Sequence, residues 1–200
     1  MDELDIDFLP AAVAEDAGVV AELTAMINDV YRVAEDGLWL AGSQRCTEAE
    51  VATMIAAGEI VAAVSGGRTV GSIRLRRLDE TRAEFGMLVA DPNHRRAGIG
   101  RALIRFAEER AATDGASWME LEVLVPREWS HPEKVFLTTW YTRIGYGKVR
   151  LGEVEESYPA LAPLLATPCD FVTYRKGLDK AGRRPAGSPA GGGTQALDAG

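Results

Sequence analysis

The residues best suited to chemistry lie between positions 85 and 102, where a predicted strand runs into a glycine-containing turn that opens a helix. The unpaired backbone amides at such a helix start converge on one point, and the helix dipole adds about half a positive charge there. Gly98 and Gly100 lack the Cβ atoms that would keep an anion away. Three nearby side chains add positive charge: Arg95, Arg96 and Arg101. We therefore expect a pyrophosphate site, although the glycines are also compatible with a turn that only shapes a helix start.

Two other phosphate-binding motifs fit this turn less well. A Rossmann dinucleotide site requires G-x-G-x-x-G and an acidic residue about 20 positions later. Leu103 stands where the third glycine of that motif is needed. A P-loop requires Gly-Lys followed by Ser or Thr, a combination that does not occur in the sequence.

Two segments resemble the GNAT N-acetyltransferase superfamily. Residues 95–102, R-R-A-G-I-G-R-A, match its [Q/R]-x-x-G-x-[G/A] signature, and residues 89–95, V-A-D-P-N-H-R, resemble the strand exit that usually precedes it. Residues 139–146, T-W-Y-T-R-I-G-Y, resemble the family's helix-to-strand element, in which a tyrosine lies beside the coenzyme's sulfur. This element follows the glycine turn by about 40 residues, which favours a functional role over simple core packing. The resemblance covers roughly residues 5–176, but only these two motifs are specific.

The resemblance implies a fold and a cosubstrate. The fold is a single-domain mixed α/β (α+β) sheet, mostly antiparallel, with a central parallel pair splayed by a bulge and helices on both faces. The cosubstrate is acetyl-CoA, with its pantetheine arm between the splayed strands and the Val89 amide donating to the thioester oxygen. No metal is expected. The residues expected to bind the coenzyme are Met87, Leu88, Val89, Arg95, Arg96, Ala97, Gly98, Ile99, Gly100, Arg101 and Lys134.

Direct acetyl transfer needs a neutral amine and a proton for the departing thiolate. Glu84 is the predicted base, because it lies eleven residues before the first arginine of the signature, which resembles the placement of the catalytic glutamate in histone-type relatives. Glu120, Glu122 or a water relay are the alternatives. Tyr141, with an ordinary pKa of about 10, is the predicted acid, and a tyrosine that only packs in the core is the alternative.

The acceptor side is predicted in the segment after the first helix. Tyr31 and Trp39 are expected to contact the acceptor, with Glu35 and Asp36 beside them. Acids in this place suit a cationic acceptor, although charged loops are usually just solvated. One position departs from the family pattern: Lys134 stands where relatives often carry an asparagine, and it either meets a coenzyme phosphate or faces water.

Hydrophobic periodicity predicts the elements that position these residues. Strands are expected at residues 6–9, 60–64, 69–78, 83–90, 118–125, 146–154 and 171–174. Helices are expected at residues 19–31, 98–113 and 133–144, and from a capping box at 47–50 to Gly58. One domain is expected to span residues 1–178. Residues 179–200, rich in Gly, Ala and Pro, are predicted to be a disordered tail because they cannot bury enough apolar surface.

The composition excludes several function classes. The 22 basic and 30 acidic residues give a net charge of -8, opposite to the field that binds a nucleic acid backbone. Cys46 and Cys169 lie far apart without a CxxC pattern, so we expect two buried apolar fillers and no zinc site. His94 and His131 are predicted to be loop residues. We expect a cytoplasmic protein without a membrane partner, because the sequence has no export signal and no apolar run near the roughly 20 residues that span a bilayer.

The leading hypothesis is an N-acetyltransferase that moves an acetyl group from acetyl-CoA directly to a primary amine. A small molecule is favoured over a protein as the acceptor. One alternative is a non-catalytic acyl-CoA-binding sensor, which would have no need for Tyr141. The other is an enzyme that acetylates a protein lysine or N-terminus. A homodimer is compatible with the sequence, which does not fix the oligomeric state.

Overall fold

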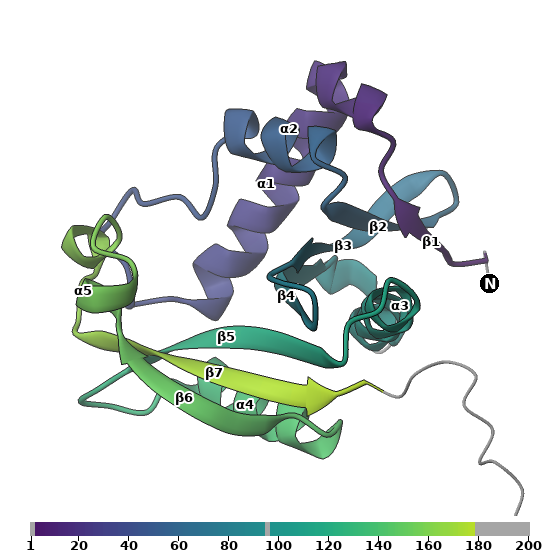
Figure 1. Cartoon of the computed structure of the whole chain (residues 1–200). Helices are drawn as coiled ribbons and strands as arrows, with labels where there is room; N and C mark the ends of the chain where they lie inside the picture. The colour runs from purple at the N-terminus through teal and green to yellow at the C-terminus, as the bar shows by residue number, and fades with distance from the viewer. Residues whose placement is uncertain (1–2, 95–96, 179–200) are drawn as a thin grey trace, which may run out of the picture.

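The computed structural model describes residues 3–94 and 97–178, which build a mixed α/β fold around one seven-stranded sheet (Figure 1). The strands are β1 (Asp5–Phe8), β2 (Ile60–Ser65), β3 (Arg68–Arg77), β4 (Arg82–Ala90), β5 (Trp118–Pro126), β6 (Gly147–Glu153) and β7 (Cys169–Gly177). They lie in the order β1-β2-β3-β4-β5-β7-β6. The central pair, β4 and β5, is parallel and the other neighbours are antiparallel, which confirms the predicted mixed sheet.

Helices cover both faces of the sheet, as predicted. On one face lie α1 (Ala17–Ala34) and α2 (Glu48–Ala56), and on the other lie α3 (Ile99–Thr113) and α4 (Pro132–Arg143). Four short helical segments have no counterpart among the predicted elements: Ala11–Glu15, Pro92–His94, α5 (Val154–Ser157) and Ala162–Leu164. Within the part of the chain that the structure describes, none of the helices is both long and apolar enough to cross a membrane. The predicted tail, residues 179–200, and the two signature arginines Arg95 and Arg96 lie outside the described residues.

Side chains at the helix starts explain where two helices begin. Asp16 Oδ1 accepts hydrogen bonds from the amides of Gly18 and Val19 and so caps α1. The predicted capping box of α2 is confirmed: Thr47 Oγ1 accepts from the Glu50 amide, and Glu50 Oε2 accepts from the Thr47 amide. Such caps satisfy amides that have no partner inside the helix. They fix the two helices that flank the predicted acceptor loop.

The apolar core lies in two main layers, one on each face of the sheet. Leu103 is fully buried between the sheet and α3, and Ile27 is fully buried between the sheet and α1. A smaller third cluster forms around Leu38, under the connection between β6 and β7. Cys46 and Cys169 are both buried and free, which agrees with their prediction as apolar fillers.

A β-bulge in β4 changes which face of the sheet its side chains cover. The pairing with β3 shifts register between Gly86 and Val89, so one residue of β3 lies opposite two residues of β4, Met87 and Leu88. Met87 has a φ of 48°, the left-handed conformation, which no other non-glycine residue adopts in the described chain. Because of the extra residue, Phe85 packs with α3 and α4, whereas Met87 packs with α1 and α2. One strand therefore serves the cores of both faces.

The strands β4 and β5 separate soon after they meet. Their parallel pairing covers only residues 82–84 and 118–120. Beyond this point β4 continues beside β3, whereas β5 pairs with β7 along its whole length. The predicted splayed pair is therefore confirmed. We call the opening between residues 85–90 of β4 and 121–126 of β5 the fork.

The first turn of α3 packs closely on the sheet because Gly71 of β3 has no side chain. A Cβ atom at this position would lie 2.7 Å from Ile99 Cγ2 and 2.9 Å from the carbonyl oxygen of Val89. Real Cβ atoms do not approach backbone oxygens so closely, so a larger residue would push the helix away. The contact holds the start of α3 against β4, beside the fork.

Candidate active site

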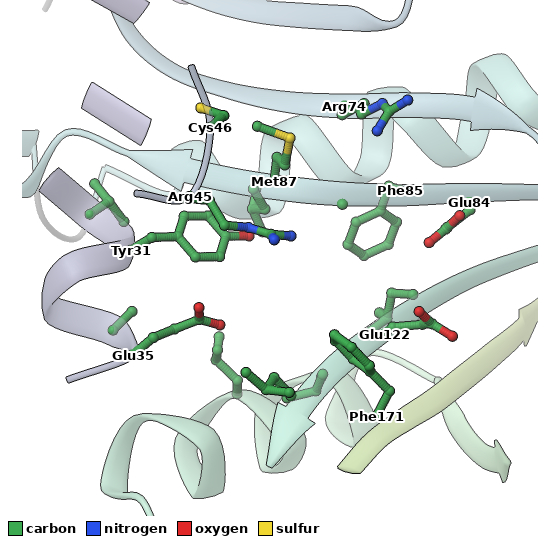
Figure 2. Close-up of a pocket in the computed structure, with 18 of the residues that line it drawn as sticks. Tyr31, Glu35, Arg45, Cys46, Arg74, Glu84, Phe85, Met87, Glu122 and Phe171 are labelled. Atoms are coloured by element: carbon green, nitrogen blue, oxygen red, sulfur yellow. The ribbon is translucent and has the colours of Figure 1, made fainter. Parts of the chain in front are cut away.

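A cavity of about 520 Å³ lies between α1 and the fork and extends to α4 (Figure 2). This volume is within the range of about 300–1,000 Å³ typical of small-molecule sites. Seven residues predicted for the site line it: Tyr31, Trp39, Glu84, Met87, Leu88, Lys134 and Tyr141. The other predicted coenzyme-binding residues within the described chain are Val89 of β4 and the residues at the start of α3.

The start of α3 carries backbone donors without a capping side chain, as the glycine turn predicts. Its N-cap residue is Gly98, which has a φ of 74° and offers no side-chain acceptor. A Cβ atom built on Gly98 would meet no atom within 4 Å, and the first turn contains no acidic residue. An anion that approaches the exposed Gly98 would therefore meet the helix start, with the amides of Ile99 and Gly100, and no side-chain cap. Ala97 and the Arg101 side chain are exposed beside them.

The strand pairing corrects the expectation for the Val89 amide. The Asp91 amide donates to the Val70 carbonyl oxygen at 2.9 Å, so these residues form a hydrogen-bonded pair of the antiparallel ladder. Hydrogen-bonded pairs recur at every second residue, so the pair of Val89 with Ser72 is hydrogen-bonded as well. The Val89 amide is therefore used inside the sheet. By the same alternation, the amide of the preceding residue, Leu88, is expected to point away from β3, toward the fork.

Tyr141 lies in the last turn of α4 and lines the cavity. Its ring packs against Phe85 and Tyr146, with centroid distances of 6.0 and 6.1 Å. Burial raises the pKa of its hydroxyl well above the usual value, so the phenol keeps its proton at neutral pH. Within the described chain, no hydrogen bond engages this hydroxyl. Tyr141 is thus a proton donor that no group of residues 3–94 and 97–178 engages.

Glu84 is half-buried where the fork begins, and Arg76 of β3 holds one of its two oxygens. The guanidinium donates to Glu84 Oε2 from Nε at 2.7 Å and from Nη2 at 2.6 Å. No hydrogen bond from the described residues reaches Oε1. Burial raises the pKa of the Glu84 carboxyl, and the charge of Arg76 opposes this effect. A carboxylate with one unengaged oxygen and a raised pKa is suited to accept a proton.

The two alternative carboxylates are placed less well for this role. Glu120 is buried, does not line the cavity, and accepts a hydrogen bond from Arg175 Nε at 2.7 Å. Glu122 lines the cavity, but both of its oxygens are occupied: Tyr158 donates to Oε2 at 2.6 Å, and Arg150 donates to Oε1 at 2.9 Å. Glu120 therefore lies outside the cavity, and Glu122 has no unengaged oxygen to offer a ligand.

The acceptor end of the cavity contains a buried ion pair. The two oxygens of Glu35 accept from Lys134 Nζ and from Trp39 Nε1, both at 2.6 Å. The alternative that Lys134 faces water is wrong, because only 6% of its side chain is exposed. Its contact with a coenzyme phosphate stays a prediction. Glu35 is therefore neutralised within the protein, contrary to the expectation that it attracts a cationic acceptor. Asp36 is exposed, and Tyr31 lines the cavity.

His131 is a buried helix cap instead of a plain loop residue. Its Nδ1 atom accepts a hydrogen bond from the Glu133 amide at 3.2 Å, so the neutral ring carries its proton on Nε2. That Nε2 atom lies 3.1 Å from the Asp36 carbonyl oxygen and donates to it. The imidazole thus joins the start of α4 to the loop after α1.

Comparison with known families decides the relationship that the fold and the glycine turn indicate. A sequence profile of the Acetyltransferase (GNAT) family matches residues 24–132, from α1 to the start of α4. The chain belongs to this family. The match includes β4, the glycine turn and α3, and it confirms the resemblance stated from the sequence motifs. No curated protein matches the sequence.

Solved structures of N-acetyltransferases share the fold of this GNAT protein. An aminoglycoside 6'-N-acetyltransferase complexed with coenzyme A aligns with a TM-score of 0.63 and 17% identity, over 91% of this chain and 99% of that chain. The PaiA N-acetyltransferase from Thermoplasma acidophilum, in complex with coenzyme A, gives 0.62 and 14%, over 88% and 99%. The ribosomal-protein-S18-alanine N-acetyltransferase from Escherichia coli gives 0.60 and 15%, over 92% and 99%. Identities this low show a common fold and leave the acceptor open.

Three arginines that line the site of this GNAT protein are missing from the predicted residues: Arg45, Arg74 and Arg76. Arg76 could have been found, because β3 alternates apolar with basic residues and its antiparallel register places Arg76 opposite Glu84. Arg45 lies in an irregular loop between α1 and α2, where no periodicity operates. Only the tertiary contacts of that loop reveal its position.

We expect Lys134→Met to lower the free energy of unfolding by about 3–5 kcal/mol, because it leaves the buried Glu35 carboxylate without its cation. The double variant Glu35→Gln/Lys134→Met should recover much of this loss. Urea denaturation of the three proteins measures both effects. A loss below about 1 kcal/mol for Lys134→Met, as is typical of an exposed ion pair, would contradict the structural role of this pair.

Proposed function

We propose that this GNAT protein transfers an acetyl group from acetyl-CoA directly to a primary amine of a small molecule. One observation supports this most strongly. The start of α3, which has no capping side chain and suits a diphosphate, lies beside the fork. The cavity lined by Tyr141 and Glu84 lies at the same fork. The cavity volume of about 520 Å³ favours a small acceptor over a protein chain.

The chain offers distinct groups to the two parts of the coenzyme. Acetyl-CoA, when bound, supplies an acetyl thioester, whose acetyl group passes to the amine nitrogen as the C–S bond breaks. The amides of Ile99 and Gly100 would hold its diphosphate, and Arg101 adds charge-assisted contacts, as Arg95 and Arg96 are also expected to do. Because β4 has no strand partner on its fork side, Met87 and Leu88 can pair through backbone groups with an extended arm.

Three groups of the chain would act on the reacting atoms. An alkylamine with a pKa of about 10 is mostly protonated at neutral pH, so Glu84 Oε1 accepts its proton, directly or through one water. The Leu88 amide donates a hydrogen bond to the carbonyl oxygen, on which negative charge develops. Tyr141, whose phenol is protonated at neutral pH, gives its proton to the sulfur of the leaving thiolate.

We expect Gly98→Glu to weaken binding of coenzyme A by at least about 100-fold, because it places bulk and negative charge where the diphosphate is expected. Titration calorimetry measures the affinity. Gly58→Glu is the matched control: its φ of 69° imposes a similar backbone strain, and its added side chain also meets open space. Equal affinities for the two variants would show that the start of α3 does not hold the coenzyme.

Tyr141→Phe should lower kcat by about 100-fold and leave the affinity for coenzyme A nearly unchanged, because it removes the acidic proton and keeps the packed ring. Thiol release with an acceptor amine gives kcat, and calorimetry gives the affinity. If affinity falls instead, the ring serves packing rather than proton transfer. Coenzyme binding by the wild type without turnover on any amine would favour the sensor over the enzyme.

We expect Glu84→Gln to lower kcat/KM by about 100-fold, because the amide cannot accept a proton. The wild-type rate should fall as the pH drops through the Glu84 pKa, which burial raises, since only the unprotonated carboxylate is active. The variant should not show this fall in rate at low pH. The part of its pH–rate profile that is set by ionisation of the amine should remain.

The control for this substitution is Glu59→Gln. Glu59 is held by Arg74 in the same way as Glu84 is held by Arg76, with Nε at 2.7 Å and Nη2 at 2.6 Å from one oxygen, but it does not line the cavity. Equal losses in the two variants, with an unchanged pH profile, would assign Glu84 a structural role.

A further inference from the structure

Arg45 presents a positive charge to the cavity without a carboxylate partner. In Figure 2 its guanidinium group lies beside the ring of Tyr31, and its Cζ atom is 4.9 Å from the ring centroid. Three other cations line the cavity, and each has a carboxylate within 4.0 Å: Arg74 with Glu59, Arg76 with Glu84, and Lys134 with Glu35. Among residues 3–94 and 97–178, Arg45 has no such partner.

The loop that carries Arg45 is fixed to α1 by one side chain. Asn28 Oδ1 accepts from the amides of Arg45 and Cys46, at 2.9 and 3.1 Å, and Asn28 Nδ2 donates to the Cys46 carbonyl oxygen at 2.9 Å. These bonds use backbone atoms of the loop and leave the Arg45 side chain available. The side chain is accessible to solvent, although protein atoms surround its guanidinium group. A cation held in this way binds an anion with little loss of conformational freedom.

No carboxylate of the described chain is paired with Arg45, although Tyr31 and Glu35 lie near enough to stabilise its charge and raise its pKa. Four acids of the cavity already receive hydrogen bonds from other groups: Glu35, Glu50, Glu84 and Glu122. Glu133, the remaining acid of the cavity lining, is exposed in the first turn of α4. Burial raises the pKa of Tyr31, so its hydroxyl stays neutral. The charge of Arg45 is therefore left for a ligand.

We propose that the acceptor carries a carboxylate in addition to its amine, and that Arg45 binds this carboxylate. This inference rests on the proposed function and names the acceptor class of the same site: small amino acids. A guanidinium pairs with a carboxylate through two parallel N–H···O bonds, so it also fixes the orientation of the ligand. Figure 2 shows Arg45 and Glu84 on opposite sides of Phe85. A ligand with a carboxylate at Arg45 and an amine toward Glu84 matches this arrangement of charge.

Titration calorimetry of the protein saturated with coenzyme A tests the proposal without requiring turnover. The probes are pairs that differ in the carboxylate: 4-aminobutyrate against butylamine, β-alanine against propylamine, and the L-α-amino acids against their carboxamides. The proteins are the wild type, Arg45→Gln, Arg45→Lys and the control Arg68→Gln. Arg68 is an exposed residue of β3 outside the cavity lining, so its substitution changes the net charge equally.

We expect at least one carboxylate-bearing probe to bind the wild type and Arg68→Gln at least about 10-fold more tightly than its partner. Arg45→Gln should weaken that probe by about 10- to 100-fold and leave its partner unaffected. Arg45→Lys, which keeps the charge but not the bidentate geometry, should lie between. The proposal is overturned if no amino acid binds, if paired probes bind the wild type alike, or if Arg45→Gln keeps full affinity.

The design separates this inference from the proposed function. If coenzyme A itself does not bind, the acetyltransferase proposal fails. If coenzyme A binds and plain amines are acetylated without preference for a carboxylate, only the role of Arg45 fails. Melting temperature and coenzyme affinity show whether Arg45→Gln is folded. If it is not, the paired probes on the wild type and on Arg45→Lys decide the question.

Discussion

The extra residue in β4 is the constraint on which the rest of the site depends. The bulge at Met87 and Leu88 turns the strand away from β5, so backbone groups that a regular sheet would use remain available at the fork. The left-handed backbone of Met87 costs on the order of 1–3 kcal/mol. Burial of its side chain against the α1 core contributes about 1.5–3 kcal/mol, which is enough to offset that cost. The cavity and the orientation of the Leu88 amide follow from the same irregularity.

Most of the fold could be predicted from the sequence, because its signals are local. Alternating strands, amphipathic helices and the Thr47 capping box appear in the structure within a few residues of their expected bounds. The short segments between β6 and β7 could not be predicted, because they have no repeat of their own and are ordered by contacts with Leu38 and Trp39. The sequence does not reveal that the Val89 amide is used inside the sheet. The β3–β4 register and the hydrogen bond from Asp91 to Val70 show this.

Residues of the site that belong to a contiguous motif could be predicted, whereas those defined by their ionic partners could not. Gly98, Tyr141 and Glu84 stand at characteristic spacings, and the structure places them around one fork. In the sequence Glu35 lies among aromatic and acidic residues, which predicts that it binds a cationic ligand. Its cation is instead Lys134, which lies 99 residues later in the chain. Among the cavity-lining cations that the structure describes, the one without a carboxylate partner is Arg45. A sequence lists charges, and a fold determines which of them are already balanced.

Two contacts join the start of helix α4 to the loop after α1. Lys134 holds Glu35, and His131 holds the carbonyl group of the next residue, Asp36. Tyr141 lies two turns farther along the same helix, next to the fork. These links make the wall on the acceptor side and the helix on the coenzyme side a single mechanical unit. For the wall around Trp39 to swing outward, these two contacts must break or the tyrosine must shift with it.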